Sequence, residues 1–209
     1  MQKVEKNIVI LISGSGSNMA AIVQAAQKEQ WRDRFNAGVV CVISNRADAP
    51  GLATAQALGI PTQLLDHKLY AQRDAFDAAL QARVDDYQPA LVVLAGFMRI
   101  LSPSFVAHFA GRLVNIHPSL LPAFTGLNTH QRAIDAGCKF VGATVHRVTE
   151  GLDQGEILAQ GIVPALPHDS ATTLAVRVLS QEHLIYPQAI RALLVKIGDS
   201  QDRPCERAN

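Results

Sequence analysis

Two uninterrupted apolar runs constrain this chain more than any other feature of its sequence. They are Ile8–Ile12 (IVILI) and Leu91–Ala95 (LVVLA), and neither offers a polar residue to either face of an extended strand. Strands that are apolar on both faces are typical of parallel sheets covered by helices on both sides. The sequence therefore predicts a core built on a parallel sheet.

The rest of the chain alternates short apolar runs with amphipathic stretches, which is the pattern of βαβ units. Further strands are predicted at 39–43, 61–65 (an edge strand), 113–117, 141–148 and 157–163, and helices at 19–27, 51–58, 70–87, 102–111, 129–136 and 170–196. The last two strands are separated only by a loop at 149–156, which suits antiparallel pairing at one side of the sheet. The predicted fold class is α/β: a Rossmann-like, doubly wound, mainly parallel sheet with an antiparallel C-terminal strand addition.

The pattern predicts a single domain over residues 1–197. Its first half, about 7–111, holds the βαβ units and an anion-binding loop, and its second half, 112–197, holds the catalytic candidates. The polar segment 198–209 is predicted to be a disordered tail. No run of about 18 apolar residues predicts a transmembrane helix, and the N-terminal segment has no signal-peptide pattern.

Charge and cysteine usage exclude several classes of protein. The 19 basic and 18 acidic residues leave a net charge of +1, without the basic excess expected of a protein that binds nucleic acid or an anionic membrane. The three cysteines form no CxxC pair, so they support neither a disulfide framework nor a cysteine zinc site. These features favour a reducing compartment, and the predicted localisation is cytoplasmic.

A glycine loop, Gly14–Asn18 (GSGSN), follows the first apolar strand and leads into a helix. Backbone N–H groups at such a helix start form an anion site, which favours a monophosphate. Two other interpretations stay open: a tight turn with a Ser or Asn N-cap, or a dinucleotide site. The third glycine of the dinucleotide motif is replaced by Met19, and Ser44–Arg46 stand where an acidic residue is usual. Arg46 leaves NADP possible.

Asn115 and His117 lie two residues apart at the end of the strand 113–117, so their side chains share one face. Carboxyl ends of strands are where open α/β sheets bind ligands. An Asn amide donates to an oxyanion, and a His donates to it or moves a proton, so the pair suits acyl transfer. Asp153, in a glycine-flanked loop, is the candidate that would hold the imidazole. A turn-forming Asn, a structural His and a surface Asp remain the alternatives, because spacing alone does not bring Asp153 to His117.

Three longer motifs carry a family resemblance: residues 92–101 (VVLAGFMRIL), 115–122 (NIHPSLLP) and 181–187 (QEHLIYP). Together they closely resemble the folate-dependent formyltransferases, over about nine tenths of the chain. Within that group the chain is most similar to the branch that formylates glycinamide ribonucleotide in purine biosynthesis. The resemblance implies 10-formyltetrahydrofolate as co-substrate, small-molecule substrates only, a tetrahedral intermediate, no metal, and a monomer or weak homodimer.

The resemblance also assigns site residues. Asn115 and His117 would meet the formyl group, with His117 as proton donor and Asp153 tuning it. The ribonucleotide would be bound by Gly16, Ser17, Asn18 and Glu182. The folate would be bound by Arg73, Met98, Arg99, Ile100, Leu101, Asn115, Thr149, Glu150, Gly151, Leu152 and Asp153.

Two of these residues also stand out in their own helices. Glu182 shares an apolar helix face with Leu174, Val178 and Ile185, where a carboxylate is costly unless it is paired. The family role for Glu182 is to bind ribose hydroxyls, and its alternative is a carboxylate at the edge of that face. Arg73 lies on the Phe76 and Leu80 face of its helix; it would meet the folate, or extend past its apolar neighbours to solvent.

The chain departs from its relatives at Ala123, where a basic residue is common, at Asn128, where a His is common, and at Gly151, where an acidic pair is common. His130, His146, His168 and His183 have no ligand-like spacing and are interpreted as structural or surface residues. The rival functions are a methionyl-tRNA formyltransferase, a formyltetrahydrofolate hydrolase and a non-catalytic nucleotide-binding module. No additional RNA-binding or regulatory segment is recognised in the sequence to favour the first two.

Overall fold

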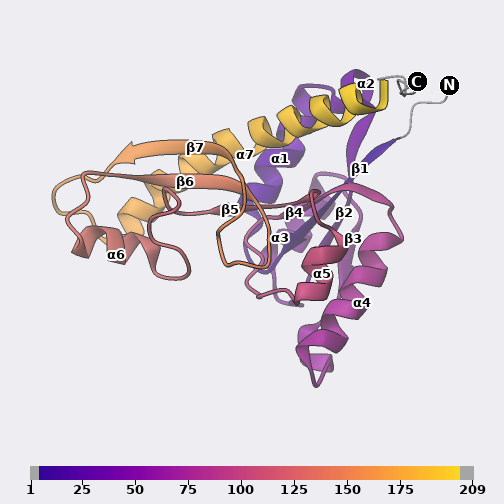
Figure 1. Cartoon of the computed structure of the whole chain (residues 1–209), viewed down its shortest axis with the longest axis horizontal. Coiled ribbons are helices and arrows are strands. Elements are labelled where there is room, and N and C mark those ends of the chain that lie inside the picture. The colour runs from indigo at the N-terminus through magenta and orange to yellow at the C-terminus, as the bar shows by residue number, and fades with distance from the viewer. Residues whose placement is uncertain (1–4, 203–209) are drawn as a thin grey trace, which may run out of the picture.

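The computed structural model describes residues 5–202, which form one seven-stranded sheet with helices on both faces (Figure 1). The strands are β1 (Lys6–Ile12), β2 (Ala37–Ser44), β3 (Thr62–Leu64), β4 (Pro89–Leu94), β5 (Leu113–His117), β6 (Phe140–Arg147) and β7 (Ile157–Pro164). The helices are α1 (Ser17–Lys28), α2 (Trp31–Phe35), α3 (Pro50–Ala57), α4 (Arg73–Asp85), α5 (Pro103–His108), α6 (Thr129–Asp135) and α7 (Ala171–Asp202), with a 3-10 turn η1 (His67–Leu69).

The strand order is β3-β2-β1-β4-β5-β6-β7. The pairings from β3 through β5 are parallel, whereas β6 and β7 add antiparallel strands beside β5. Strands β2 and β3 are added on one side of β1, and β4 and β5 on its other side. The order of addition therefore reverses between β1 and β4, and the carboxyl ends of these two strands flank the crevice in which such sheets bind ligands. The predicted fold class, with its antiparallel C-terminal addition, is confirmed.

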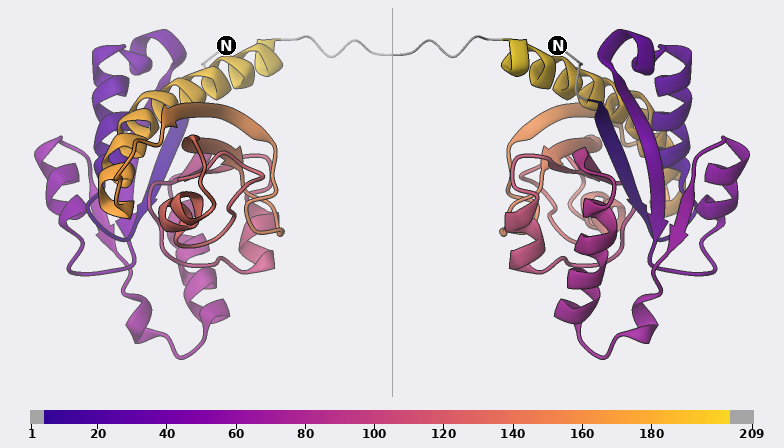
Figure 2. Two further views of the ribbon diagram at one scale, coloured as in Figure 1. Left: turned by 90° about the vertical axis from the view of Figure 1, so that its left-hand side faces the viewer. Right: turned by 90° about the vertical axis from the view of Figure 1, so that its right-hand side faces the viewer.

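Strand β1 shows why the core needed apolar residues on both faces. Ile8, Ile10 and Ile12 pack into the cluster that α1 and α7 cover. Val9 and Leu11 point the other way, into the cluster that α4 and α5 cover. Figures 1 and 2 show these two layers of helices on opposite sides of the sheet. The period of two along a strand therefore places every residue of the run in one core or the other.

Helix α7 is longer than the sequence indicated. It continues to Asp202, so residues 198–202 are helical and the predicted tail was wrong for them, while 203–209 lie outside the described residues. Pro187 lies inside this helix and removes one helical hydrogen bond. The helix continues past it because Tyr186, Ile190 and Leu194 are buried against the sheet. Tertiary packing here outweighs local helix preference.

Two short elements were not predicted, α2 and η1. Each is a single turn, too short to show helical periodicity, and α2 is anchored by the fully buried Trp31. Helix α5 is also shorter than the predicted 102–111, although Ser102 caps it and Pro103 begins it as expected. Within the described residues, no helix combines the length and apolar character needed to cross a membrane.

Candidate active site

Strand β5 presents Asn115 and His117 at its carboxyl end, and β6 completes the surface beside it. Antiparallel pairing sets Asn115 opposite His146 and His117 opposite Thr144. Since side chains two residues apart share a face, the four polar groups lie on the same side of the two strands. The pair Thr144 and His146 is therefore part of the same polar surface as the predicted pair.

His117 is buried and faces acceptors at both ring nitrogens. Its Nδ1 lies 3.4 Å from Asp153 Oδ2, and its Nε2 lies 2.9 Å from the Phe124 carbonyl oxygen. A neutral imidazole donates from only one nitrogen, so only the imidazolium donates at both positions. The surroundings of His117 thus offer an acceptor to each ring nitrogen.

Asp153 reaches His117 from the loop between β6 and β7. Its backbone has φ 55°, a left-handed conformation that Asp and Asn adopt more readily than most residues. The Gly126 N–H donates to Asp153 Oδ2 at 2.9 Å, which fixes the carboxylate against the segment that follows β5. The structure therefore brings together the three residues that spacing along the chain could not join.

His146 belongs to this cluster, although the sequence interpretation placed it among structural or surface histidines. Its side chain is 2% exposed, and its Nε2 lies 3.2 Å from Asn115 Nδ2 and 3.7 Å from Asp153 Oδ1. The available signal was local: Thr144 and His146 are two polar residues two positions apart, on either side of the apolar Val145, near the end of the strand. Without the register of β6 against β5, that spacing did not say which neighbours His146 would meet.

Two effects compete for the proton of His146. Burial lowers its pKa, while a hydrogen bond to the Arg147 carbonyl and the charge of Asp153 raise it, and burial prevails. The ring is therefore neutral at pH 7, and the short distance to Asp153 is not a charged pair. With its Nδ1–H donated to the Arg147 carbonyl at 2.9 Å, Nε2 is free to accept from the Asn115 amide, which orients that amide.

The glycine loop leaves the start of α1 open for an anion. Gly16 is the N-cap, with φ 72°, and no side chain caps the helix. The loop also lies tightly against α3, because an added Cβ at Gly16 would come 2.8 Å from Gly51 Cα. The N–H groups of Ser17 and Asn18 begin the helix without a capping side chain, so the Ser or Asn cap considered from the sequence is not formed. An anion site fits this geometry.

Asn18 and Glu182 meet in the buried space between α1 and α7. Asn18 Nδ2 donates to Glu182 Oε2 at 2.6 Å, while the Asn18 amide oxygen has no partner among residues 5–202. Burial raises the pKa of Glu182, against smaller lowering effects of the Asn18 hydrogen bond and of His117. Leu174, Val178 and Ile185 are buried beside it on α7, as the sequence predicted. This pair is a polar site within an apolar surface.

The segment 98–101 presents apolar side chains to solvent. Met98 is 76% and Ile100 68% exposed, while Leu101 is buried and Arg99 lies over the Phe76 ring at 4.6 Å. The other predicted folate loop begins after Val148, which packs against the same cluster as Phe97 and Leu101. That loop contains Thr149, Glu150, Gly151 and the exposed Leu152. The two loops therefore flank one region next to Asp153.

Arg73 stands apart from these loops. It is the first residue of α4, its side chain is half-exposed, and its ion pair is with the adjacent Asp74 at 3.8 Å. Phe76 and Leu80 are buried on that helix, so Arg73 does not share their environment as the helical face suggested. Arg73 is connected to the region only through its own helix, where the ring of Phe76 lies under the Arg99 guanidinium.

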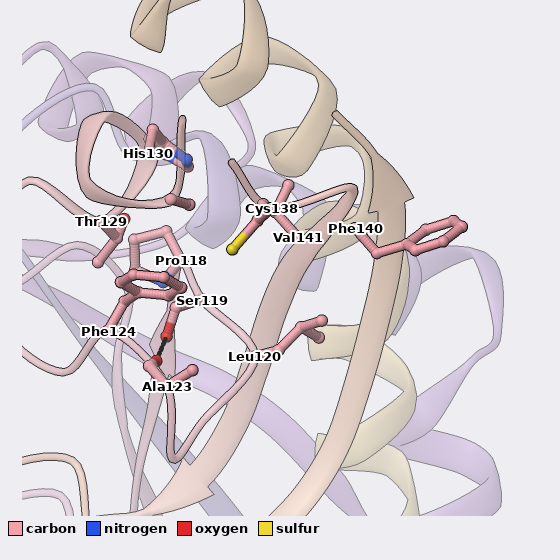
Figure 3. Close-up of a pocket in the computed structure, with 11 residues that line it drawn as sticks. Pro118, Ser119, Leu120, Ala123, Phe124, Thr129, His130, Cys138, Phe140 and Val141 are labelled. Atoms are coloured by element: carbon pink, nitrogen blue, oxygen red, sulfur yellow. Dashed lines mark hydrogen bonds between the residues drawn. The ribbon is translucent and has the colours of Figure 1, made fainter. Parts of the chain in front are cut away.

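A cavity of about 130 Å³ is lined by residues of the segment after β5, of α6 and of the start of β6 (Figure 3). Its lining contains no predicted site residue, but Phe124 borders both spaces, since its carbonyl accepts from His117. Ala123 also lines the cavity, and Asn128 caps α6 with φ 56°, a conformation that suits Asn. Two of the three departures from the family pattern therefore fall in the segment that shapes this cavity.

Comparison with known proteins identifies the family. Residues 6–190 match the model of the formyl transferase family. The chain is 48% identical to the phosphoribosylglycinamide formyltransferase of Escherichia coli K12, over 88% of this chain and 85% of that protein. It is 50% identical to the crystal structure of a phosphoribosylglycinamide formyltransferase from Brucella melitensis, with a TM-score of 0.84 over 91% of this chain and 96% of that one.

A longer relative contains the same unit. The human trifunctional purine biosynthetic protein adenosine-3 is 40% identical over 95% of this chain, which spans 20% of that protein's length.

Proposed function

Since the chain belongs to the formyl transferase family, we propose that it moves the formyl group of 10-formyltetrahydrofolate to the amine of glycinamide ribonucleotide. Its activity is that of a phosphoribosylglycinamide formyltransferase, an enzyme of de novo purine biosynthesis. The observation that supports a catalytic site in this chain is the convergence of Asn115, His117 and Asp153 at the end of β5. The identity of the formyl donor and the role of each residue are part of the proposal.

Asn115 stabilises the charge that develops on the formyl oxygen. The ribonucleotide amine attacks the formyl carbon, forming a carbon–nitrogen bond and a tetrahedral centre with a negatively charged oxygen. The Asn115 amide donates to that oxygen, which is worth about 3 kcal/mol in a site that excludes water. When the centre collapses, the bond from carbon to the folate N10 breaks, and that nitrogen leaves with the proton lost from the attacking amine.

His117 transfers protons next to Asn115. As an imidazolium it donates a hydrogen bond to the same oxygen and delivers a proton towards the leaving nitrogen. Asp153, 3.4 Å from its Nδ1, stabilises the charged ring. The Phe124 carbonyl, which accepts from Nε2 in this structure, must give up that contact when substrate binds. The neutral His146 accepts a hydrogen bond from the Asn115 amide and so orients that amide towards the formyl oxygen.

The ribonucleotide is held from the other side of the crevice. Its phosphate lies on the N–H groups of Gly16, Ser17 and Asn18, where the positive end of α1 favours an anion. Its ribose hydroxyls bind Glu182, whose carboxylate is held by Asn18. The buried, unpartnered Asn18 amide oxygen supports a ligand donor at this position.

The folate lies between the loops 98–101 and 149–153. Exposed Met98, Ile100 and Leu152 offer apolar contacts to a flat ring system, and the backbone of both loops offers hydrogen-bonding groups. Arg99 is fixed over Phe76 at the base of this region. The exposed guanidinium of Arg73 attracts the acidic tail of the folate by its charge.

The test mixes purified protein with glycinamide ribonucleotide and 10-formyltetrahydrofolate and follows the absorbance of the deformylated folate. We expect turnover that requires both substrates. Deformylation in the absence of ribonucleotide would indicate a formyltetrahydrofolate hydrolase instead. Ligand binding without any deformylation would indicate a non-catalytic nucleotide-binding module.

We also propose that the enzyme works in the cytoplasm as a monomer or weak homodimer. The free thiols of Cys41 and Cys138 support a reducing compartment. Fractionation of cells and sedimentation across a range of protein concentrations test the two parts separately.

A further inference from the structure

A chain of hydrogen bonds crosses the carboxyl ends of β1, β2 and β4, outside the catalytic cluster. The Ser13 hydroxyl donates to Asn45 Oδ1 at 2.6 Å, and the backbone N–H of Met98 donates to Ser13 Oγ at 2.8 Å. Ser13 and Asn45 are only 4% and 3% exposed. Buried polar contacts of this kind are costly to break, because each partner would be left without a hydrogen bond.

Ser13 binds the segment after β4 at two points. Besides the contact from Met98, its own N–H donates to the Gly96 carbonyl at 3.1 Å. The next residue, Gly14, accepts from the Gly51 N–H at 3.0 Å, at the start of α3. The beginning of the glycine loop is therefore fixed to the beginning of the segment that contains residues 98–101.

Asn45 sets the direction of the Ser13 hydroxyl. Its backbone carbonyl accepts from the His67 Nδ1–H at 2.7 Å, so that ring nitrogen, 3.3 Å from the Asn45 amide nitrogen, is not also an acceptor for the amide. The Asn45 amide oxygen faces Ser13 and accepts the hydroxyl hydrogen at 2.6 Å. The lone pairs of Ser13 Oγ are then free for the Met98 N–H.

We propose that Ser13 is a positioning residue that couples ribonucleotide binding at the glycine loop to folate binding at residues 98–101. The inference rests on the proposed function, because it takes these two loops as the binding loops. A ligand that orders one loop also orders Ser13, and through it the N–H of Met98 at the start of the other loop. Such coupling is reciprocal: each ligand must strengthen the other by the same factor.

The experiment measures that factor by calorimetry with glycinamide ribonucleotide and tetrahydrofolate, a pair that cannot react because no formyl group is present. For the wild type we expect each ligand to tighten binding of the other about fivefold or more. In Ser13→Ala the factor should fall below about twofold. Coupling that came only from direct contact between the two ligands would persist in Ser13→Ala. An unchanged factor in that variant would therefore overturn the proposal. A wild-type factor near one would overturn it as well.

Matched variants separate coupling from stability. Ser44→Ala removes another fully buried hydroxyl at the same edge of the sheet, whose hydrogen bonds within the described part of the chain go to the Arg46 backbone, and should keep the wild-type factor. Ser13→Thr keeps the hydroxyl and should restore the factor. If Ser13→Ala does not fold, Asn45→Ala takes its place, since it removes the acceptor that directs Ser13, and its factor should also fall.

Loss of coupling in Ser44→Ala as well would assign the effect to general loosening and contradict the proposal. Turnover by the wild type is scored separately. A wild type that turns over both substrates but shows no coupling overturns this inference alone, whereas one that does not turn over at all removes the proposed function.

Discussion

The parallel and antiparallel parts of the sheet build their polar sites in different ways. Beside β1, the predicted phosphate site is backbone from one short segment, residues 16–18, at the start of α1. Beside β5, the cluster is made of side chains from β5, β6 and the loop after β6. An anion can be bound by one local conformation, whereas stabilising a tetrahedral centre requires several groups aimed at one point.

Glu182 joins the two parts. It lies on α7, the last helix, yet its carboxylate accepts from Asn18 at the start of α1. Tyr186, one turn further along, donates to the carbonyls of Leu94, the last residue of β4, and of Val114 in β5. Because the β5 cluster acts on the reacting atoms and the glycine loop on the bound phosphate, variants of the cluster should change kcat. Variants of the glycine loop should change KM for the ribonucleotide.

The largest effect is expected for Asn115→Ala. Loss of the oxyanion donor should lower kcat at least a hundredfold, about 3 kcal/mol, with both KM values within about threefold of wild type. Steady-state kinetics with each substrate varied measures the split. Asn7→Ala, which removes an amide bonded to the Tyr87 carbonyl far from the cluster, is the control and should keep kcat. A kcat within tenfold of wild type for Asn115→Ala would remove Asn115 from the mechanism.

The next effect is expected for Gly16→Ala. Its φ of 72° disfavours a side chain by about 1–2 kcal/mol, and the new Cβ would lie 2.8 Å from Gly51 Cα. The shifted loop should raise KM for the ribonucleotide about tenfold and leave kcat at saturation nearly unchanged. Gly59→Ala is a matched control, because Gly59 has φ 77° and open space around its Cβ position. An equal rise of KM in both variants would show a general loss of stability rather than a phosphate site.

Glu182→Gln should separate binding from stability. Burial raises the pKa of Glu182 above its ordinary value of 4.5, so the folded state holds this proton more tightly than the unfolded state. Wild-type stability at this group therefore falls as pH rises from 4.5 through the raised pKa, and Gln does not titrate. We expect KM for the ribonucleotide to rise about fivefold, a loss of about 1 kcal/mol.

The same variant should unfold at a higher temperature than wild type at pH 8, with the difference vanishing below pH 4.5. Thermal melts from pH 4 to 8 measure it, and Glu5→Gln, on an exposed ion pair with Arg32, is the control. A variant that is less stable than wild type at pH 8 would contradict the sign derived from burial.

The smallest effect is expected for Tyr186→Phe. Removing the hydroxyl leaves the Leu94 and Val114 carbonyls without this donor and should cost about 1 kcal/mol of unfolding free energy. Urea titration measures this loss, and kcat/KM should change less than threefold. Tyr70→Phe is the comparison, since no hydrogen bond of the Tyr70 hydroxyl is recorded within residues 5–202, and its stability should stay near wild type. Equal stability of the two variants would mean that Tyr186 does not fix α7 to the sheet.

Much of the fold was predictable because its signals are local. The apolar runs 8–12 and 91–95 place two strands with both faces buried, and the order of strands and helices predicts the parallel sheet with its antiparallel addition. The short helix α2 was missed because burial of Trp31 holds it, and η1 because it is one turn capped by the Asp66 side chain. The length of α7 was underestimated because Ile197, just beyond the predicted end, packs against the core.

For the site, the sequence by itself determined the chemistry on offer: a glycine loop before a helix, an Asn and a His on one strand face, and a carboxylate on an apolar helix face. Only the tertiary structure decided which groups meet. It set Asp153 against His117, brought the neutral His146 to Asn115, and paired Glu182 with Asn18. Periodicity fixes the direction of a side chain within its own element, whereas distances between elements follow from sheet register and helix packing, which involve residues far apart in the chain.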